Sequence, residues 1–170
     1  FRRKEKKLYK VSDYIGCMSL ANVEYVLNHN AGITEDRVEV APNSFEIEDN
    51  EDNNTISQDL KNRIREKYGL PENMPIFIYG GSLGKPQGIP FLIECLEANS
   101  SRDDCHFLVI GTGTELPYLM QWFEEKHPKN VTVMKGLPKA EYDELVGTCD
   151  VGMIFLDHRF TIPNYPSRVL

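Results

Sequence analysis

Residues 76–98 read IFIYGGSLGKPQGIPFLIECLEA, and this stretch decides the predicted fold. It begins with an apolar run, Ile76 to Tyr79, of the kind found in strands that are buried on both faces. Glycines then recur between residues 80 and 88, where the missing Cβ lets a backbone approach a ligand closely. Apolar residues at helical spacing follow. The stretch therefore predicts a strand, a glycine-rich turn and an amphipathic helix in direct succession.

The turn at residues 80–88 is a candidate anion site. The free N–H groups and the dipole of a helix N-terminus attract phosphate groups, and this turn leads directly into a helix. A tight strand-to-helix turn without a ligand explains the same residues equally well. The local sequence leaves both interpretations open.

The chain after this turn repeats the same order of elements. We expect strands at residues 106–110, 130–134 and 150–155, and helices at residues 114–126 and 138–147. Apolar strands that alternate with helices indicate an α/β fold, a Rossmann-like doubly wound parallel sheet with helices on both faces. Ligands of such sheets bind at the carboxyl ends of the strands. Four loops should therefore meet there: residues 80–88, 111–114, 135–138 and 156–167.

The chain before this sheet predicts a separate, smaller region. Residues 1–11 predict a basic helix, and short strands are expected at residues 14–18 and 37–41, with Ser19 as the N-cap of the helix between them. The acidic residues 46–54 are either a linker or a solvated loop. Thr55 and Gln58 predict a capping box at the start of the next helix.

Composition and charge narrow the class of protein. The 170 residues have a net charge of −7, which argues against a general nucleic-acid binder. The first ten residues contain six Lys or Arg and one Glu, which leaves 13 basic and 25 acidic residues, a net charge of −12, in the remainder. The basic helix is either a solvated face or a contact with anionic lipid. No apolar run approaches the ~20 residues of a membrane span.

The cysteines give no sign of a metal site. Cys17, Cys95, Cys105 and Cys149 lack metal-type spacing and lie in or beside apolar runs, as expected for free thiols in a reducing cytoplasm. The chain begins at Phe1 and ends in PSRVL, and we expect both ends to be cut from a longer protein.

The later loops offer further ligand contacts. Gly111, Thr112 and Gly113 follow a strand, but Leu116 stands where the dinucleotide fingerprint needs a small residue, so a nicotinamide or flavin site is disfavoured. Gly136 and Leu137 lie between a strand and a helix, where backbone groups can bind a ligand or simply form the turn. Pro166, Ser167 and Arg168 predict the first turn of another helix, a second candidate anion site.

The order of these motifs resembles glycosyltransferase family 4, the group 1 transferases of the GT-B fold, in their C-terminal donor-binding domain. Residues 76–97 resemble the family pattern V-G-R-L-x-x-x-K-G-x-x-x-L-I-x-A, and FLVIGTGTELPYL resembles L-x-I-x-G-x-G. Residues 130–156 resemble V-x-F-x-G-x-V-P-x-x-E-L-x-x-x-Y-x-x-A-D-V-x-V. Residues 12–46 are similar to the interdomain passage, and the last ten residues are similar to the branch that makes bacterial surface polysaccharides.

The resemblance implies a function. Residues 1–44 would be the end of an N-terminal domain and the interdomain passage, and residues 45–170 a nucleotide-sugar-binding domain that is incomplete at its C-terminus. The expected activity is hexosyl transfer from a UDP- or GDP-type donor to a saccharide or lipid-linked acceptor, without a metal or other cofactor. We expect a cytoplasmic location, with a peripheral contact at the inner face of the membrane left open.

The resemblance also implies site residues. The nucleotide base would lie on the loops at residues 111–114 and 136–138, and the diphosphate over residues 80–88. The donor-binding residues would be Gly81, Ser82, Lys85, Gln87, Gly111, Thr112, Gly113, Gly136, Leu137, Pro166, Ser167 and Arg168. No catalytic residue is assigned, because the acceptor side would belong to the N-terminal domain. The isolated chain should therefore bind nucleotide weakly at best and transfer nothing.

Three departures from the family pattern keep other functions open. Ser82 and Gln87 stand where the family has Arg and Lys, so Lys85 would have to substitute. Pro163 stands where the first of two family Glu residues would fall, and the second would fall after Leu170. The alternatives are a non-catalytic binding module with a degenerate site and a nucleotide-sugar epimerase of related fold.

Overall fold

The computed structural model describes residues 2–44 and 56–163. The chain divides into two compact units, one of residues 1–49 with 158–170 and the other of residues 50–157. The predicted boundary between residues 44 and 45 stays a prediction. Each unit is described by itself below.

The first unit is a small α/β arrangement. It contains the helix α1 (Arg2–Val11), the strand β1 (Ile15–Cys17), the helix α2 (Leu20–His29), a 3-10 turn at Glu35–Arg37 and the strand β2 (Val38–Val40). The two strands pair in parallel, with Ile15 opposite Val38. The Ser19 side chain accepts a hydrogen bond from the Asn22 backbone N–H, which confirms the predicted N-cap of α2. The core of this unit consists of Ile15, Cys17, Val26 and Val38.

The second unit contains the predicted parallel sheet. Its elements are α3 (Gln58–Lys67), β3 (Ile76–Ser82), a 3-10 turn η2 (Lys85–Gln87), α4 (Ile89–Ala98), β4 (His106–Thr112), α5 (Leu116–Lys126), β5 (Val131–Lys135), α6 (Lys139–Val146) and β6 (Val151–Gly152). The strand order is β5-β4-β3-β6, and every pair is parallel. The chain therefore winds outward from β3 to β5 and then crosses back to the other side of β3.

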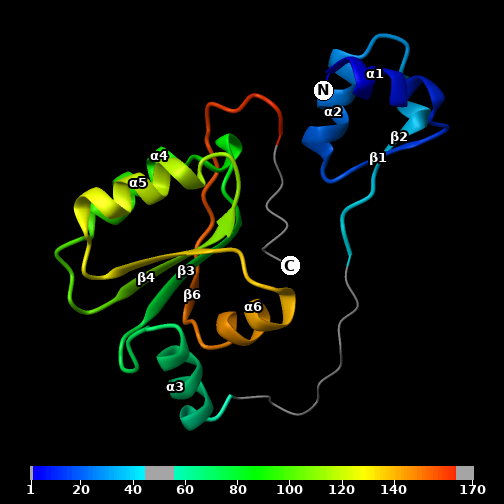
Figure 1. The fold of residues 1–170 in the computed structure, drawn as a ribbon. Helices are drawn as coiled ribbons and strands as arrows, with labels where there is room; N and C mark the ends of the chain where they lie inside the picture. Colours follow the sequence, from blue (N-terminus) through cyan, green and yellow to red (C-terminus); the bar gives the residue numbers. More distant parts are fainter. Residues whose placement is uncertain (1, 45–55, 164–170) are drawn as a thin grey trace. The chain divides into compact units, whose positions relative to one another are not determined.

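Helices cover both faces of this sheet, as predicted (Figure 1). Successive strand residues point to opposite faces. Phe77 and Tyr79 of β3 pack in the core that includes α4 and α5 residues, whereas Ile76 and Ile78 pack in the core that includes α3 and α6 residues. Burial on both faces explains why the strand sequences are apolar without alternation.

Several predicted element bounds differ from the structure. The strand predicted at residues 106–110 continues to Thr112, and the helix predicted from residue 114 begins at Leu116. The strand that was expected to end at Tyr79 continues to Ser82, so the first part of the glycine-rich turn is strand. Ser57 is the N-cap of α3 and Gln58 is its first residue, so the predicted capping box of Thr55 and Gln58 is wrong. The last strand pairs over Val151–Gly152 only, instead of residues 150–155.

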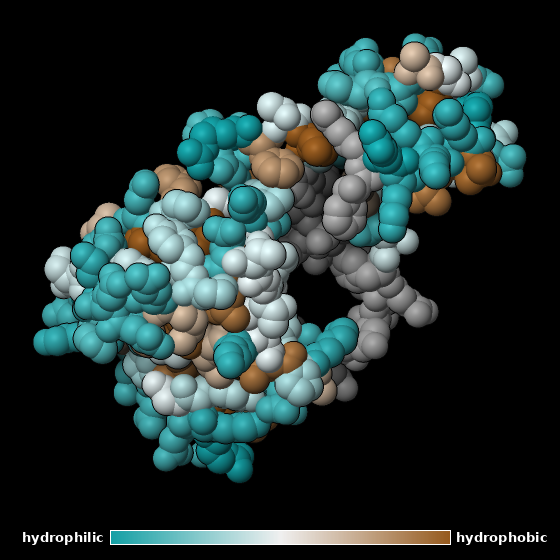
Figure 2. All heavy atoms as spheres, turned by 45° about the horizontal axis from the view of Figure 1, so that its top comes forward, coloured by the Kyte–Doolittle hydropathy of each residue, from teal (hydrophilic) through white to brown (hydrophobic). Residues whose placement is uncertain are grey.

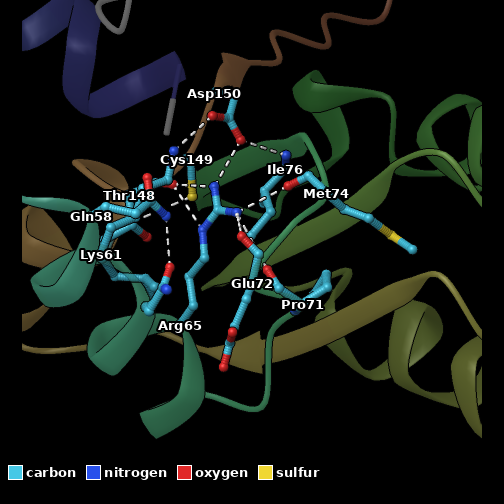
Figure 3. A network of polar contacts seen from close by, with 12 residues as sticks. Gln58, Lys61, Arg65, Pro71, Glu72, Met74, Ile76, Thr148, Cys149 and Asp150 are labelled. Carbon is cyan, nitrogen blue, oxygen red and sulfur yellow. Dashed lines mark hydrogen bonds and ion pairs between the residues drawn. The ribbon is translucent and has the colours of Figure 1, made fainter.

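A buried arginine joins the elements at the amino edge of the sheet (Figure 3). Arg65, on α3, is 1% exposed. Its guanidinium donates to the backbone carbonyls of Pro71, Glu72, Met74 and Thr148. It also pairs with the Asp150 carboxylate, with an Nη2–Oδ2 distance of 2.8 Å.

Asp150 completes this network from the start of β6. Its Oδ2 accepts the backbone N–H of Ile76 at 2.8 Å, and its Oδ1 pairs with Lys61 at 2.9 Å. Partial burial favours the protonated carboxyl, but the donors from Ile76, Lys61 and Arg65 outweigh it and hold the pKa of Asp150 below its ordinary value. The network therefore fixes the ends of β3 and β6, whose opposite ends form the carboxyl edge.

Candidate functional site

The carboxyl edge of the sheet contains a cavity of about 330 Å³. It lies where β3, β4 and β5 end and α6 begins. Its lining residues are Gly81, Ile110, Gly111, Thr112, Gly136, Leu137, Lys139 and Tyr142. The structure thus brings together five of the predicted donor-binding residues, from three segments that are far apart in the sequence: the ends of β3 and β4 and the turn after β5. Its position is where parallel α/β sheets bind their ligands.

The cavity has an apolar wall and a polar rim. Leu137 and Tyr142 are partly buried and pack against the core beside Ile110, which is itself buried. Thr112 is exposed, and Lys139 forms an exposed ion pair with Asp143. An apolar wall beside a few polar groups is typical of sites for flat, partly polar molecules.

Close packing within the protein explains two of the glycines at this edge. A Cβ on Gly111 would lie 2.0 Å from the carbonyl oxygen of Gly81, its partner on the neighbouring strand. A Cβ on Gly113 would lie 2.2 Å from the carbonyl oxygen of Leu83. Neither residue can therefore be larger, whether or not a ligand binds. The glycines that prompted the ligand hypothesis have a structural function of their own.

Hydrogen bonds fix the first loop against the second. The backbone N–H of Leu83 donates to the Thr112 carbonyl, and the Leu83 carbonyl accepts from the Glu115 N–H, both at 2.9 Å. The Gln87 side-chain oxygen accepts the Gly84 N–H at 3.2 Å, so Gln87 stabilises its own turn. Ser82 and Lys85 are exposed beside this scaffold. The loop therefore presents these two side chains from a backbone that is already hydrogen-bonded.

The fourth predicted loop meets the first at one point. The Asp157 backbone N–H donates to the Pro86 carbonyl at 2.9 Å, and Asp157 atoms lie within about 3.5 Å of the position that a Cβ on Gly88 would occupy. Gly88 has a φ of +63° and begins α4. The segment therefore passes over the start of α4. This is the helix N-terminus that the sequence predicts as a candidate anion site.

The remaining predicted residues are not placed in the cavity. Ser82, Lys85, Gln87 and Gly113 belong to the adjoining loops but do not line it. Pro166, Ser167 and Arg168 lie outside the described residues.

Three lining residues were missed by the sequence analysis: Ile110, Lys139 and Tyr142. Lys139 and Tyr142 are three residues apart in the first turns of α6, so they share a helix face. A pair of residues three apart at the start of a helix, shortly after the glycine that ends a strand, could have identified Lys139 and Tyr142 in the sequence. Ile110 gives no such signal, because any buried strand residue has the same appearance in sequence.

A larger cavity of about 880 Å³ lies at the opposite, amino edge of the sheet. His106 and Asn130, at the starts of β4 and β5, are among its lining residues and are largely buried. Burial lowers the pKa of His106, whose Nε2 lies 2.9 Å from the Thr132 hydroxyl. Size alone would favour this cavity, whereas topology favours the carboxyl edge.

The described residues contain neither a helix that could span a membrane nor a cluster of metal-binding side chains. Across residues 2–44 and 56–163, no helix is long and apolar enough to cross a membrane. Within the same ranges, no three His, Cys, Asp or Glu side chains cluster in a way that could hold a metal ion.

The chain is similar in fold to solved glycosyltransferase structures. A glycosyltransferase from Rickettsia africae ESF-5 matches with a TM-score of 0.65 and 20% identity, over 89% of this chain and 41% of that one. TarM matches with a TM-score of 0.54 and 13% identity, over 84% of this chain and 25% of that one. The chain thus spans less than half the length of either structure. No curated protein matched the sequence.

The sequence itself matches a family model. The model is described as "Glycosyl transferases group 1" and matches residues 61–154, from α3 to the segment just after β6. The matched range includes all four strands of the parallel sheet and every residue that lines the carboxyl-edge cavity. The chain belongs to the group 1 glycosyltransferases.

Proposed function

We propose that the chain binds a nucleotide-sugar donor of UDP or GDP type for a glycosyltransferase of family 4. The transferase would move a hexose to a saccharide or lipid-linked acceptor, in the cytoplasm, during synthesis of a bacterial surface polysaccharide. The observation that supports this most is the carboxyl-edge cavity, because residues predicted from three separate motifs line it together. Donor recognition of this kind would need no metal.

The cavity suits the nucleotide base. Leu137 and Tyr142 provide apolar surface against which a flat ring can pack. The Thr112 hydroxyl and the backbone of Gly136, both exposed, can form hydrogen bonds with the polar edge of the ring. The choice between uracil and guanine would depend on these polar contacts.

The diphosphate would extend from the cavity over the end of β3. Ser82 follows Gly81, which lines the cavity, and Lys85 lies three residues further on. Both are exposed, so a hydroxyl donor and an ammonium group are available to the phosphates. Fixed donors of this kind stabilise the charge that develops on a leaving diphosphate. Gln87 would contribute through its side-chain N–H groups, because its oxygen already accepts from Gly84.

A degenerate binding module is the second candidate. This candidate is favoured by Ser82 and Gln87, which stand in place of two basic residues. Without those positive charges the diphosphate is bound less strongly, which lowers the affinity for the donor. Nucleotide binding without glycosyl transfer by the longer parent protein would identify such a module. Release of free nucleoside diphosphate without acceptor glycosylation would identify an epimerase instead. The isolated 170 residues should bind weakly and transfer nothing.

Substitution of Thr112 by Phe tests the site, because a large ring at this exposed rim position fills the cavity without disturbing the core. In titration calorimetry with UDP, GDP and their hexose conjugates, we expect affinity to fall at least about tenfold, a loss of ~1.4 kcal/mol. Thr114→Phe is the matched control, since Thr114 is exposed in the same loop but does not line the cavity. Equal losses in both variants, or no saturable binding by the unmodified chain at millimolar ligand, contradict the proposal.

A further inference from the structure

The carboxyl-edge cavity gathers apolar side chains in a unit whose visible surface is largely hydrophilic. On the face of the second unit that Figure 2 shows, at the lower left, hydrophilic residues surround separate apolar patches. In the cavity, Ile110 is buried, and Leu137 and Tyr142 are partly buried beside it. Tyr142 has the largest of these side chains. Its position therefore has the greatest effect on the space that remains for a ligand.

The Tyr142 ring is held against the sheet from both ends of the residue. The Tyr142 backbone N–H donates to the Pro138 carbonyl at 2.9 Å, in the first turn of α6. At the other end, a Cβ on Gly80 would collide with the Tyr142 hydroxyl oxygen and lie 2.8 Å from the ring carbon that bears it. The hydroxyl end of the ring thus lies directly over the β3 backbone. The ring therefore cannot move closer to the sheet.

Both residues of this contact depart from the family patterns. Gly80 stands where V-G-R-L-x-x-x-K-G has its Val, and Tyr142 stands where P-x-x-E-L has its Leu. A valine at residue 80 would occupy the space of the tyrosine hydroxyl group. The ring at residue 142 thus requires the glycine at residue 80, so the two departures belong together. They give this chain a bulkier cavity wall than the patterns imply.

The strand side of the cavity is equally rigid. Gly81 and Gly111 are partners on β3 and β4, and a Cβ on Gly111 would collide with the Gly81 carbonyl oxygen. The cavity volume of about 330 Å³ lies near the lower end of the range of ligand sites, about 300–1,000 Å³. A ligand must therefore fit the space that the Tyr142 ring leaves, because neither the ring nor the strands can withdraw.

We propose that Tyr142 limits the size of the base that the cavity accepts, and that this chain prefers the single ring of uracil to the fused rings of guanine. The inference rests on the proposed donor-binding function, since it concerns the base of the same nucleotide. A difference of one methylene group in an apolar pocket changes affinity by roughly 10–200-fold, and guanine exceeds uracil by a whole ring. The wall adds this limit on size to the choice that the polar contacts at the rim make.

The ratio of two dissociation constants tests this inference. The isotopically labelled chain is titrated separately with UDP and GDP, and amide chemical shifts give each constant. We expect UDP to bind at least about tenfold more tightly than GDP. Tyr142→Leu should bring the two constants to within about threefold of each other, chiefly through tighter binding of GDP, because the shorter side chain opens the wall.

Two control variants separate the ring from other effects. Tyr142→Phe keeps the ring and should keep the ratio. Tyr118→Leu removes an exposed ring on α5 that does not line the cavity, and it should keep the ratio too. Partial unfolding of a variant weakens the apparent binding of both nucleotides alike, so the ratio reports the shape of the site.

The possible failures are distinct from one another. Equal affinity of the unmodified chain for UDP and GDP would overturn the preference and leave the proposed donor-binding function standing. An unchanged ratio in Tyr142→Leu, including an equal loss of both affinities, would show that Tyr142 only supports the fold. Binding of neither nucleotide by the unmodified chain would overturn the donor-binding function, and this inference with it.

Discussion

At the scale of single residues, Arg65 shows how one charged side chain can fix an edge of the sheet. Its guanidinium is almost completely buried and donates to backbone carbonyls from two segments, residues 71–74 and Thr148. These carbonyls have no other donor in the described hydrogen bonds. Their satisfaction and the ion pair with Asp150 therefore depend on the same side chain.

We predict that Arg65→Met lowers the free energy of unfolding by about 3 kcal/mol, because it leaves buried carbonyls without their donor and removes one of the three partners of the Asp150 carboxylate. Urea denaturation at neutral pH measures the change. Arg63→Met is the control on the same helix, where the ion pair with Asp59 is exposed, and should stay within about 0.5 kcal/mol of the unmodified chain. Similar losses in the two variants would refute a special function of Arg65.

At the scale of elements, the approach of α6 to β3 shapes the wall of the cavity. A Cβ on Gly80 would lie 1.9 Å from the Tyr142 hydroxyl oxygen and 2.8 Å from the ring carbon that bears it. Tyr142 can therefore occupy its position on the cavity wall only because β3 has a glycine there. The contact between Gly80 and Tyr142 therefore determines both how α6 packs on β3 and how the cavity wall is shaped.

We predict that Gly80→Ala lowers the free energy of unfolding by about 2 kcal/mol through this clash. Gly152→Ala is the control in the same sheet, where nothing lies within 4 Å of the added Cβ, and should be close to neutral. In a double-mutant cycle, Tyr142→Leu should make the Gly80→Ala change less costly, because it removes the atoms in the clash. Additive effects in the cycle would show that the two residues do not interact.

The elements also show how far sequence can predict this fold. The alternation of apolar strands and helices was sufficient to predict the parallel sheet. A strand that is buried on both faces needs apolar residues at nearly every position, and this is visible in the sequence. The end of β3 was not predictable, since Gly80 and Gly81 are poor strand formers and only their pairing with β4 makes them strand. The position of Arg65 was hidden, because an arginine among Lys, Asn and Glu on a helix has the pattern of a solvated face.

The candidate site was predictable in part for the same physical reason. Gly111 and Thr112 end β4 and Gly136 follows β5, and parallel strands end at one edge, so their meeting follows from topology. Tyr142 enters the site through the tertiary approach of α6, which no local pattern encodes. Predictions for Pro166, Ser167 and Arg168 remain predictions.

For the molecule as a whole, we propose that ligands bind at the carboxyl edge of the sheet in the second unit. The amino edge has the larger cavity, about 880 Å³ against about 330 Å³. Topology and volume therefore point to opposite ends of the same sheet. Which of the two cavities binds a nucleotide also tests whether this member of the group 1 family binds a sugar-nucleotide donor.

The most direct measurement is a titration of the isotopically labelled chain with UDP and GDP, followed by amide chemical shifts. We predict that the largest shifts fall at the ends of β3 and β4 and at the start of α6, including Gly81, Thr112 and Gly136. Amides that line the amino-edge cavity, such as His106, His127 and Asn130, should not move. Shifts confined to the amino edge, or none at millimolar nucleotide, would contradict the claim.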